Sequence, residues 1–185
     1  MDTAPERIYD SLKTEADLAA LIRDRREEDL HIEFKQKEDS RSGELGDGDK
    51  RSFSRALAGF ANADGGVLVF GVETKKGSDN LDRAVALKPI TGHMSMVARL
   101  RDAVFNTTHP TINGVRIEPI DVVSGNMSGY VKCLIPQSDK PPHRAMQAER
   151  EYWRRTNGAY QRMEHYELED VFGRRLRPFL ALRKL

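Results

Sequence analysis

The order of apolar and polar residues predicts helices and strands that alternate along the first half of the chain. The first thirty residues follow a helical period, and Thr14 is placed to open a second helix there. Over residues 30–35 apolar and polar side chains alternate, which is typical of a strand with one buried face. Residues 36–49 carry almost no apolar side chains and are predicted to form a loop.

The rest of the chain repeats this mixture of elements. The apolar stripe of residues 53–60 predicts a helix, and the continuous apolar run of residues 67–72 predicts a strand buried on both faces. Residues 73–80 are charged and are predicted to form a turn. We expect further helices over 94–105 and 164–172, and further strands over 114–123, 130–135 and 151–155. The predicted fold class is α/β (α+β), a mixed β-sheet flanked by helices.

Composition narrows the class of protein. The 185 residues suit a single domain, and the 38% of hydrophobic residues is enough for a packed core. The net charge of +1 excludes a protein that is basic throughout, although it allows local basic patches. The single Cys133 excludes a disulfide framework within the chain and a cysteine-based zinc site. We expect a cytoplasmic protein without a membrane partner, because no apolar run approaches about 20 residues.

Three glutamates are candidates for a metal site. Glu33 shares the polar face of the first strand with Lys35, Glu28 lies five positions earlier, and Glu73 directly follows the buried strand. If these strands are neighbours, the carboxylates converge, and Mg²⁺ or Mn²⁺ relieves their repulsion. Such a metal supports phosphodiester cleavage, with Lys35 stabilising charge on the phosphate. The alternative is that Glu33 and Lys35 form a solvated ion pair on an exposed strand face.

The last quarter of the chain is basic and contains aromatic residues. From residue 140 onward there are eleven Lys and Arg against six Asp and Glu. Basic side chains interleaved with aromatic ones can bind phosphates and stack on unpaired bases. The alternative places the aromatic rings in the core and leaves the arginines solvated at the surface. The candidate nucleic-acid-binding residues are Lys140, His143, Arg144, Trp153, Arg154, Arg155, Tyr160 and Arg162.

Three sequence blocks, in this order, resemble the Schlafen AlbA-like domain. They are residues 28–35 (EDLHIEFK), residues 58–73 (AGFANADGGVLVFGVE), and a third block with Pro142-His143, residues 152–155 (YWRR), residues 158–160 (GAY) and Met163. The resemblance covers residues 28–172 of a single domain over 1–185. Residues 1–27 are then a helical extension, and residues 173–185 form a basic tail.

This resemblance implies a nucleic-acid-binding protein. In the Schlafen nucleases two related lobes form a basic cleft, and three acids cleave transfer or ribosomal RNA with Mg²⁺ or Mn²⁺. The matching positions here are Glu28, Glu33 and Glu73, and Glu73 replaces an aspartate. The resemblance therefore implies a metal-dependent endoribonuclease acting on structured RNA such as tRNA, with DNA as another possible ligand. Because one lobe is present, it also implies a homodimer.

Two other functions stay open at this point. The first is a non-catalytic regulatory module that binds DNA or RNA and whose acids and arginines form structural ion pairs. The second is a nucleotide-binding module. Against the second, residues 62–66 join a helix to a strand, and no Gly-Lys-Ser/Thr sequence follows to form a phosphate-binding loop.

Overall fold

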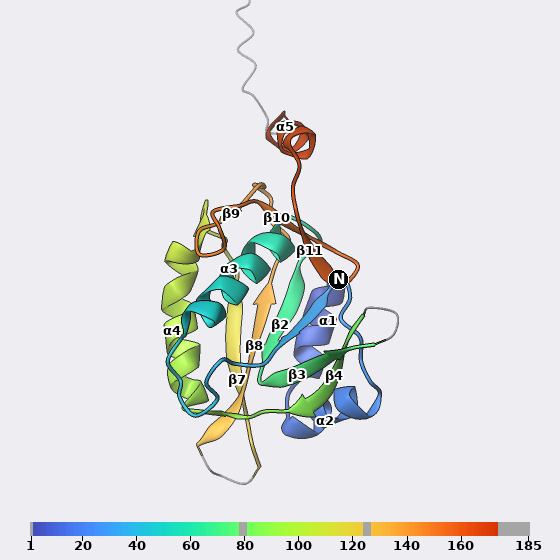
Figure 1. Cartoon of the computed structure of the whole chain (residues 1–185), viewed down its shortest axis with the longest axis vertical. Helices are drawn as coiled ribbons and strands as arrows, with labels where there is room; N and C mark the ends of the chain where they lie inside the picture. The colour runs from blue at the N-terminus through green and yellow to red at the C-terminus, as the bar shows by residue number, and fades with distance from the viewer. Residues whose placement is uncertain (1, 78–80, 124–126, 174–185) are drawn as a thin grey trace, which may run out of the picture.

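A computed structural model describes residues 2–77, 81–123 and 127–173 of the chain. Helices and strands are interspersed along it, as the sequence predicts (Figure 1). The helices are α1 Ala4–Ser11, α2 Glu15–Arg23, α3 Asp47–Ala61, α4 His93–Thr107 and α5 His165–Gly173. The strands are β1 Ile32–Lys35, β2 Gly66–Phe70, β3 Val72–Lys76, β4 Asp82–Leu87, β5 Ile90–Thr91, β6 Thr108–His109, β7 Arg116–Asp121, β8 Ser128–Ile135, β9 Arg144–Ala145, β10 Trp153–Thr156 and β11 Ala159–Arg162.

The central sheet is mixed, which confirms the predicted fold class. β1 pairs with β2 in parallel, and β2 pairs with β8 in antiparallel orientation. β7 and the short β5 also pair with β8. The parallel pair sets Glu33 opposite Leu68 of β2. The first strand and the buried strand are therefore neighbours, as the prediction of a shared acidic site requires.

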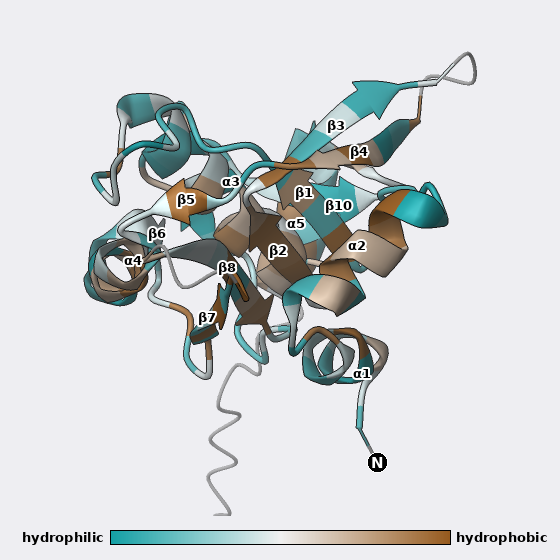
Figure 2. Ribbon diagram, turned by 90° about the horizontal axis from the view of Figure 1, so that it is seen from below, coloured by the Kyte–Doolittle hydropathy of each residue, from teal (hydrophilic) through white to brown (hydrophobic). Residues whose placement is uncertain are grey.

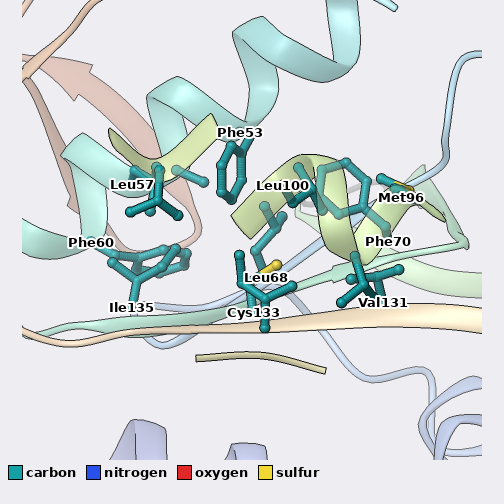
Figure 3. Close-up of a cluster of buried hydrophobic side chains, with 14 of the residues drawn as sticks. Phe53, Leu57, Phe60, Leu68, Phe70, Met96, Leu100, Val131, Cys133 and Ile135 are labelled. Atoms are coloured by element: carbon teal, nitrogen blue, oxygen red, sulfur yellow. The ribbon is translucent and has the colours of Figure 1, made fainter. Parts of the chain in front are cut away.

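The core has two halves, one on each face of the sheet. On one face, α3 and α4 pack Phe53, Leu57 and Leu100 against β2 and β8, as Figure 3 shows. On the other face, α1 and α2 cover alternate residues of β1 and β2. Side chains alternate between the faces of a strand, so β2 contributes to both halves and is buried along its whole length. Thr14 caps α2 through a reciprocal pair with Asp17, as its position predicts.

Two predicted loops differ from the structure. Residues 73–76 do not form a turn, because β3 pairs with β4 as a hairpin after Gly71 ends β2 with a φ of 96°. The loop after β1 ends at α3, which begins at Asp47 inside the predicted loop. Asp49 fixes this loop, because its buried carboxylate accepts hydrogen bonds from the backbone N–H groups of Glu38 and Gly46 and pairs with Lys37 at 3.2 Å.

The C-terminal elements lie over one end of the molecule. The β10–β11 hairpin packs against α3, and α5 extends beyond it (Figure 1). The predicted strand over residues 151–155 corresponds to β10, and the predicted helix over 164–172 corresponds to α5. The basic tail lies outside the described residues except for Gly173. None of the helices described here has the length and apolar character needed to cross a membrane.

Candidate functional site

Glu33 projects from β1 into the interior of the protein. Ile32 and Phe34 face the core half that α1 and α2 cover, so Glu33 between them faces the opposite side. The β10–β11 hairpin covers that side, and Glu33 is only 3% exposed. The polar face of the strand is therefore real, as the alternation predicts, but it is not open to solvent.

Arg155 of β10 is the principal partner of Glu33. Its Nη1 donates to Oε2 of Glu33, while its Nε and Nη2 donate to the backbone carbonyls of Asp29 (2.9 Å) and Ile32 (3.0 Å). The guanidinium is thus held at three points and is 2% exposed. A buried guanidinium needs such partners because charge is costly to remove from water. Arg155 therefore fixes the hairpin to β1.

Glu28 completes this buried cluster. Its Oε1 accepts a hydrogen bond from the backbone N–H of Phe34 at 3.0 Å, and its Oε2 lies 3.8 Å from Nη2 of Arg155. Burial, and then the negative charge of Glu33, raise the pKa of Glu28 to about 8. Glu28 is therefore mainly protonated at neutral pH. Because Glu28 is mainly protonated, the two acids can share the site.

Lys35 lies where this cluster meets the solvent. Its Nζ is 2.5 Å from Oε1 of Glu33, and its side chain is 35% exposed. Burial acts to lower the pKa of Lys35, but the carboxylates of Glu33 and Glu28 outweigh it and the pKa is raised. Each carboxylate oxygen of Glu33 therefore has its own cation. We call Glu28, Glu33, Lys35 and Arg155 the buried ion cluster.

Aromatic rings close the buried ion cluster on the side of α3. The Arg155 guanidinium lies 4.6 Å from the ring centre of Tyr160 and 5.4 Å from that of Phe60. Burial raises the pKa of Tyr160 well above its usual value, so its hydroxyl stays neutral. Gly59 makes room for this ring, because an added Cβ would lie 2.5 Å from Cδ1 of Tyr160. Gly59, Phe60 and Tyr160 thus share a structural role in closing the cluster.

Glu73 does not join the other two acids. It lies in β3, half-exposed, and its carboxylate pairs with Lys88 at 3.2 Å. Within residues 2–77, 81–123 and 127–173, no group of three or more His, Cys, Asp or Glu is arranged to hold a metal. The oxygens of Glu33 are already engaged by Lys35 and Arg155. This donor set, with two cations among its members, does not fit Mg²⁺ or Mn²⁺.

The turn after α3 has a structural role. The side-chain amide of Asn62 donates to the backbone carbonyls of His143 and Trp153, both at 2.8 Å, and its carbonyl oxygen accepts from the N–H of His143 at 2.7 Å. His143 is buried, with its ring nitrogens against Pro110 and Ser138. The turn therefore ties the C-terminal segment to the helix, and its helix-to-strand order presents no phosphate-binding loop.

The remaining candidate residues for nucleic-acid contact divide by burial. Trp153 is buried, and the guanidinium groups of Arg55 and Arg162 lie 4.5 and 5.4 Å from its ring centre. Trp153, His143 and Arg155 are thus part of the interior and are not placed to touch a ligand. Arg154 is half-exposed and pairs with Glu167 at 2.8 Å, and exposed Arg162 pairs with Glu149. Lys140 is exposed and Arg144 is partly exposed.

Sequence reasoning found both acids of the buried ion cluster but assigned Arg155 to a different role. Arg155 and Glu33 are 122 positions apart, and no spacing rule connects them. For Asn62, the sequence alone predicts only a place in a turn. The available signal was that Phe60, Asn62 and Tyr160 belong to the sequence blocks that carry the family resemblance.

Known proteins resemble this chain in sequence and in fold. The family model described as "Schlafen, AlbA_2" matches residues 28–164, which include every member of the buried ion cluster. None of the curated proteins matches the chain. A crystal structure of a Corynebacterium diphtheriae protein is similar with a TM-score of 0.52 at 12% identity, covering 84% of this chain and 31% of that one. The chain thus spans about a third of the length of that protein.

A second solved structure is similar over nearly its whole length. It is the solution structure of the N-terminal domain of a protein from Nitrosomonas europaea, described as related to the ATP-dependent DNA helicase RecG. The TM-score is 0.52 at 19% identity, with 84% of this chain and 97% of that domain covered. At these identities the two structures show a shared fold. Because the family model covers well over half of the sequence, the chain belongs to the Schlafen AlbA_2 family.

Proposed function

We propose that this chain is a nucleic-acid-binding module, with RNA as the favoured ligand. The observation that carries the proposal is the match to the Schlafen AlbA_2 family over residues 28–164, because nucleic-acid binding is what that resemblance implies. The similar domain from Nitrosomonas europaea, which belongs to a protein related to a DNA helicase, supports the same class of ligand. Fold similarity alone does not establish a function, so the proposal also has to be supported by the arrangement of individual residues.

In this proposal the buried acids stabilise the binding surface. Arg155 links the β10–β11 hairpin to β1 through Glu33, and two hydrogen bonds to backbone carbonyls hold the guanidinium there. The cations on the outside of the hairpin are then free to exchange their protein partners for phosphates. Arg162 is the best placed, because both it and its partner Glu149 are exposed. Arg154 is half-exposed, although its partner Glu167 is largely buried. A phosphate backbone would compete with these ion pairs.

The second candidate function is a metal-dependent endoribonuclease acting on structured RNA. The observation in its favour is that Glu28, with a pKa raised to about 8, lies beside the charged Glu33 and the partly exposed Lys35. A carboxyl group whose pKa is raised toward neutral pH is typical of acid–base catalysis. A substrate would first have to displace Arg155 or approach past Lys35. We rank this function second because the donor set does not fit Mg²⁺ or Mn²⁺.

One experiment separates the two functions. Fluorescently labelled tRNA is titrated with the protein in Mn²⁺ and, separately, in a chelator, and the RNA is then analysed on a denaturing gel. The binding module retains intact RNA under both conditions, whereas the nuclease cuts it only with metal. Arg154→Gln/Arg162→Gln should weaken binding, while the matched control Arg7→Gln/Lys13→Gln removes two exposed charges elsewhere. If wild-type protein does not bind RNA or DNA at all, the proposed function is wrong.

A further inference from the structure

A basic cavity lies between the end of α2 and the β3–β4 hairpin and shares no lining residue with the buried ion cluster. Its volume is about 560 Å³, which is within the range of about 300–1,000 Å³ found for ligand sites. The described lining residues include four cations and no acid. The cations are Arg25, Lys75, Lys76 and Arg83, and Ile22 and Val85 add apolar wall. In a chain whose net charge is only +1, such a local excess is a specific feature.

The two walls of this cavity are joined by the backbone. The N–H of Ala84 in β4 donates to the carbonyl of Arg26 at 3.0 Å, and the N–H of Glu28 donates to the carbonyl of Asp82 at 2.9 Å. α2 lies directly beside β4, and the hairpin extends from the sheet with hydrophilic residues toward the end of β3 (Figure 2). The four cations are therefore carried on elements that are fixed relative to one another, as a binding site requires.

Arg25 is held in an unfavourable backbone conformation. It follows α2 with a φ of 48°, in the left-handed region that glycine adopts far more readily than other residues. The N–H of Arg25 donates to Ile22 and the N–H of Arg26 donates to Leu21, which is the helix-ending arrangement that favours glycine at this position. For the fold alone, glycine would serve better. The presence of arginine at this position indicates a functional role for its guanidinium.

The charges in the cavity are only partly balanced. Arg83 pairs with Glu27 beside the cavity. For Arg25, Lys75 and Lys76, the described part of the chain supplies no acidic side chain in an ion pair. Like charges around one cavity repel each other, and an anion between them relieves the repulsion. Both lysines are also exposed and can reach an incoming ligand.

We propose that the cavity lined by Arg25, Lys75, Lys76 and Arg83 is a binding site for phosphate groups. This inference deepens the proposed function and rests on it for the source of the phosphate, which we take to be the backbone of a nucleic acid. A small phosphate compound would use the same chemistry. The site is separate from the β10–β11 hairpin, so the module would contact its ligand on two surfaces.

The most informative variant is Arg25→Gly. If Arg25 had only a structural role, this substitution would not change RNA binding. Our proposal predicts that the variant binds RNA more weakly than wild type, although it is at least as stable. Glycine relieves the left-handed backbone, so the melting temperature should stay equal or rise by up to about 3 °C. Each phosphate contact to a single strand contributes about 0.7 to the slope of log K against log salt, so at about 0.1 M salt one lost contact weakens binding about fivefold.

The test measures binding of short single-stranded RNA by fluorescence anisotropy over a range of salt, together with calorimetric titration of pyrophosphate. We expect Arg25→Gly to lose about fivefold and Lys75→Gln/Lys76→Gln about 25-fold in RNA affinity, with reduced salt slopes. The control Arg7→Gln/Lys13→Gln should stay within about twofold of wild type. If the cavity variants still bind RNA but no longer bind pyrophosphate, the site binds small phosphate compounds. That result supports the phosphate site and corrects its source.

Two results would overturn the inference. In the first, the wild-type protein binds RNA, and the cavity variants bind both RNA and pyrophosphate as tightly as wild type does. The proposed function then survives, but the cavity is not the phosphate site. In the second, wild type binds neither RNA nor pyrophosphate, and both proposals fail. If wild type binds pyrophosphate but neither RNA nor DNA, and the cavity variants lose the pyrophosphate binding, the phosphate site is supported and the proposed function fails.

Discussion

Replacing Glu33 with glutamine tests whether the buried ion cluster stabilises the fold. If Glu33 belonged to a cluster of repelling acids, its loss would cost little stability. In the structure it lies instead between Arg155 and Lys35, and the variant Glu33→Gln leaves a buried guanidinium without its charged partner. We therefore expect a clear loss of stability.

The magnitude follows from the burial of both partners. Removing one member of a buried ion pair typically costs about 3–5 kcal/mol. Two effects reduce this figure here: the glutamine oxygen can still accept from Arg155, and Glu28 can ionise more easily once its charged neighbour is gone. Glu28 already lies 3.8 Å from Nη2 of Arg155 and can partly replace Glu33. We expect a loss of about 2–3 kcal/mol in the free energy of unfolding, or about 5–10 °C in melting temperature.

Circular dichroism melts at pH 7 measure this difference, and the chain supplies a matched control. Glu73→Gln makes the same chemical change in a half-exposed ion pair with Lys88, where at most about 1 kcal/mol is expected. Glu33→Gln should therefore melt well below Glu73→Gln. If the two variants melt within about 2 °C of each other, the buried ion cluster does not stabilise the protein as we argue.

The remaining predictions concern pH, packing and assembly. The pKa of Glu28 is raised to about 8 in the folded protein from an ordinary value of 4.5, so its contribution to stability is complete below about pH 4.5 and is lost as pH rises to about 8. Glu28→Gln should remove that loss. In urea unfolding at several pH values, the free energy of unfolding of the variant should therefore rise relative to that of wild type as pH rises. If the two proteins show the same pH dependence, the pKa of Glu28 is not raised. Gly59→Ala should destabilise α3 although alanine favours helices, because its Cβ meets the ring of Tyr160, and the effect should vanish in a Tyr160→Leu background. Denaturation midpoints for the four proteins test this coupling, which independent, additive effects would contradict. We also predict a homodimer, and light scattering that gives the monomer mass at micromolar concentration would reject it.

Much of the fold follows from local patterns in the sequence. The buried run of β2 and the apolar stripe of α3 predict their own elements, because each pattern has the period of one structure. The β3–β4 hairpin was not predictable in this way. The residues of β3 after Val72 are polar because this strand extends beyond the sheet, so its sequence resembles a charged turn.

The candidate site was predictable only in part. Alternation placed Glu33 and Lys35 on one face of β1, but burial of that face depends on Arg155, which comes from a hairpin far along the chain. Arg155 belongs to a basic, aromatic segment whose composition equally suits an RNA-binding surface. The role of Arg25 could not be predicted from the sequence for the same reason, because its unusual φ depends on how α2 ends against β4.

The most direct test of the central claim is a titration of labelled tRNA with wild-type protein in the presence of a metal chelator. If the chain is a binding module whose acids form a buried ion cluster, the RNA binds saturably without metal, binds more weakly as salt rises, and remains intact. At matched ionic strength, Mn²⁺ in place of the chelator should not strengthen the binding. Binding that requires Mn²⁺, or cleavage that Mn²⁺ switches on in wild type and that a folded Glu33→Gln variant lacks, would contradict this account and favour the nuclease.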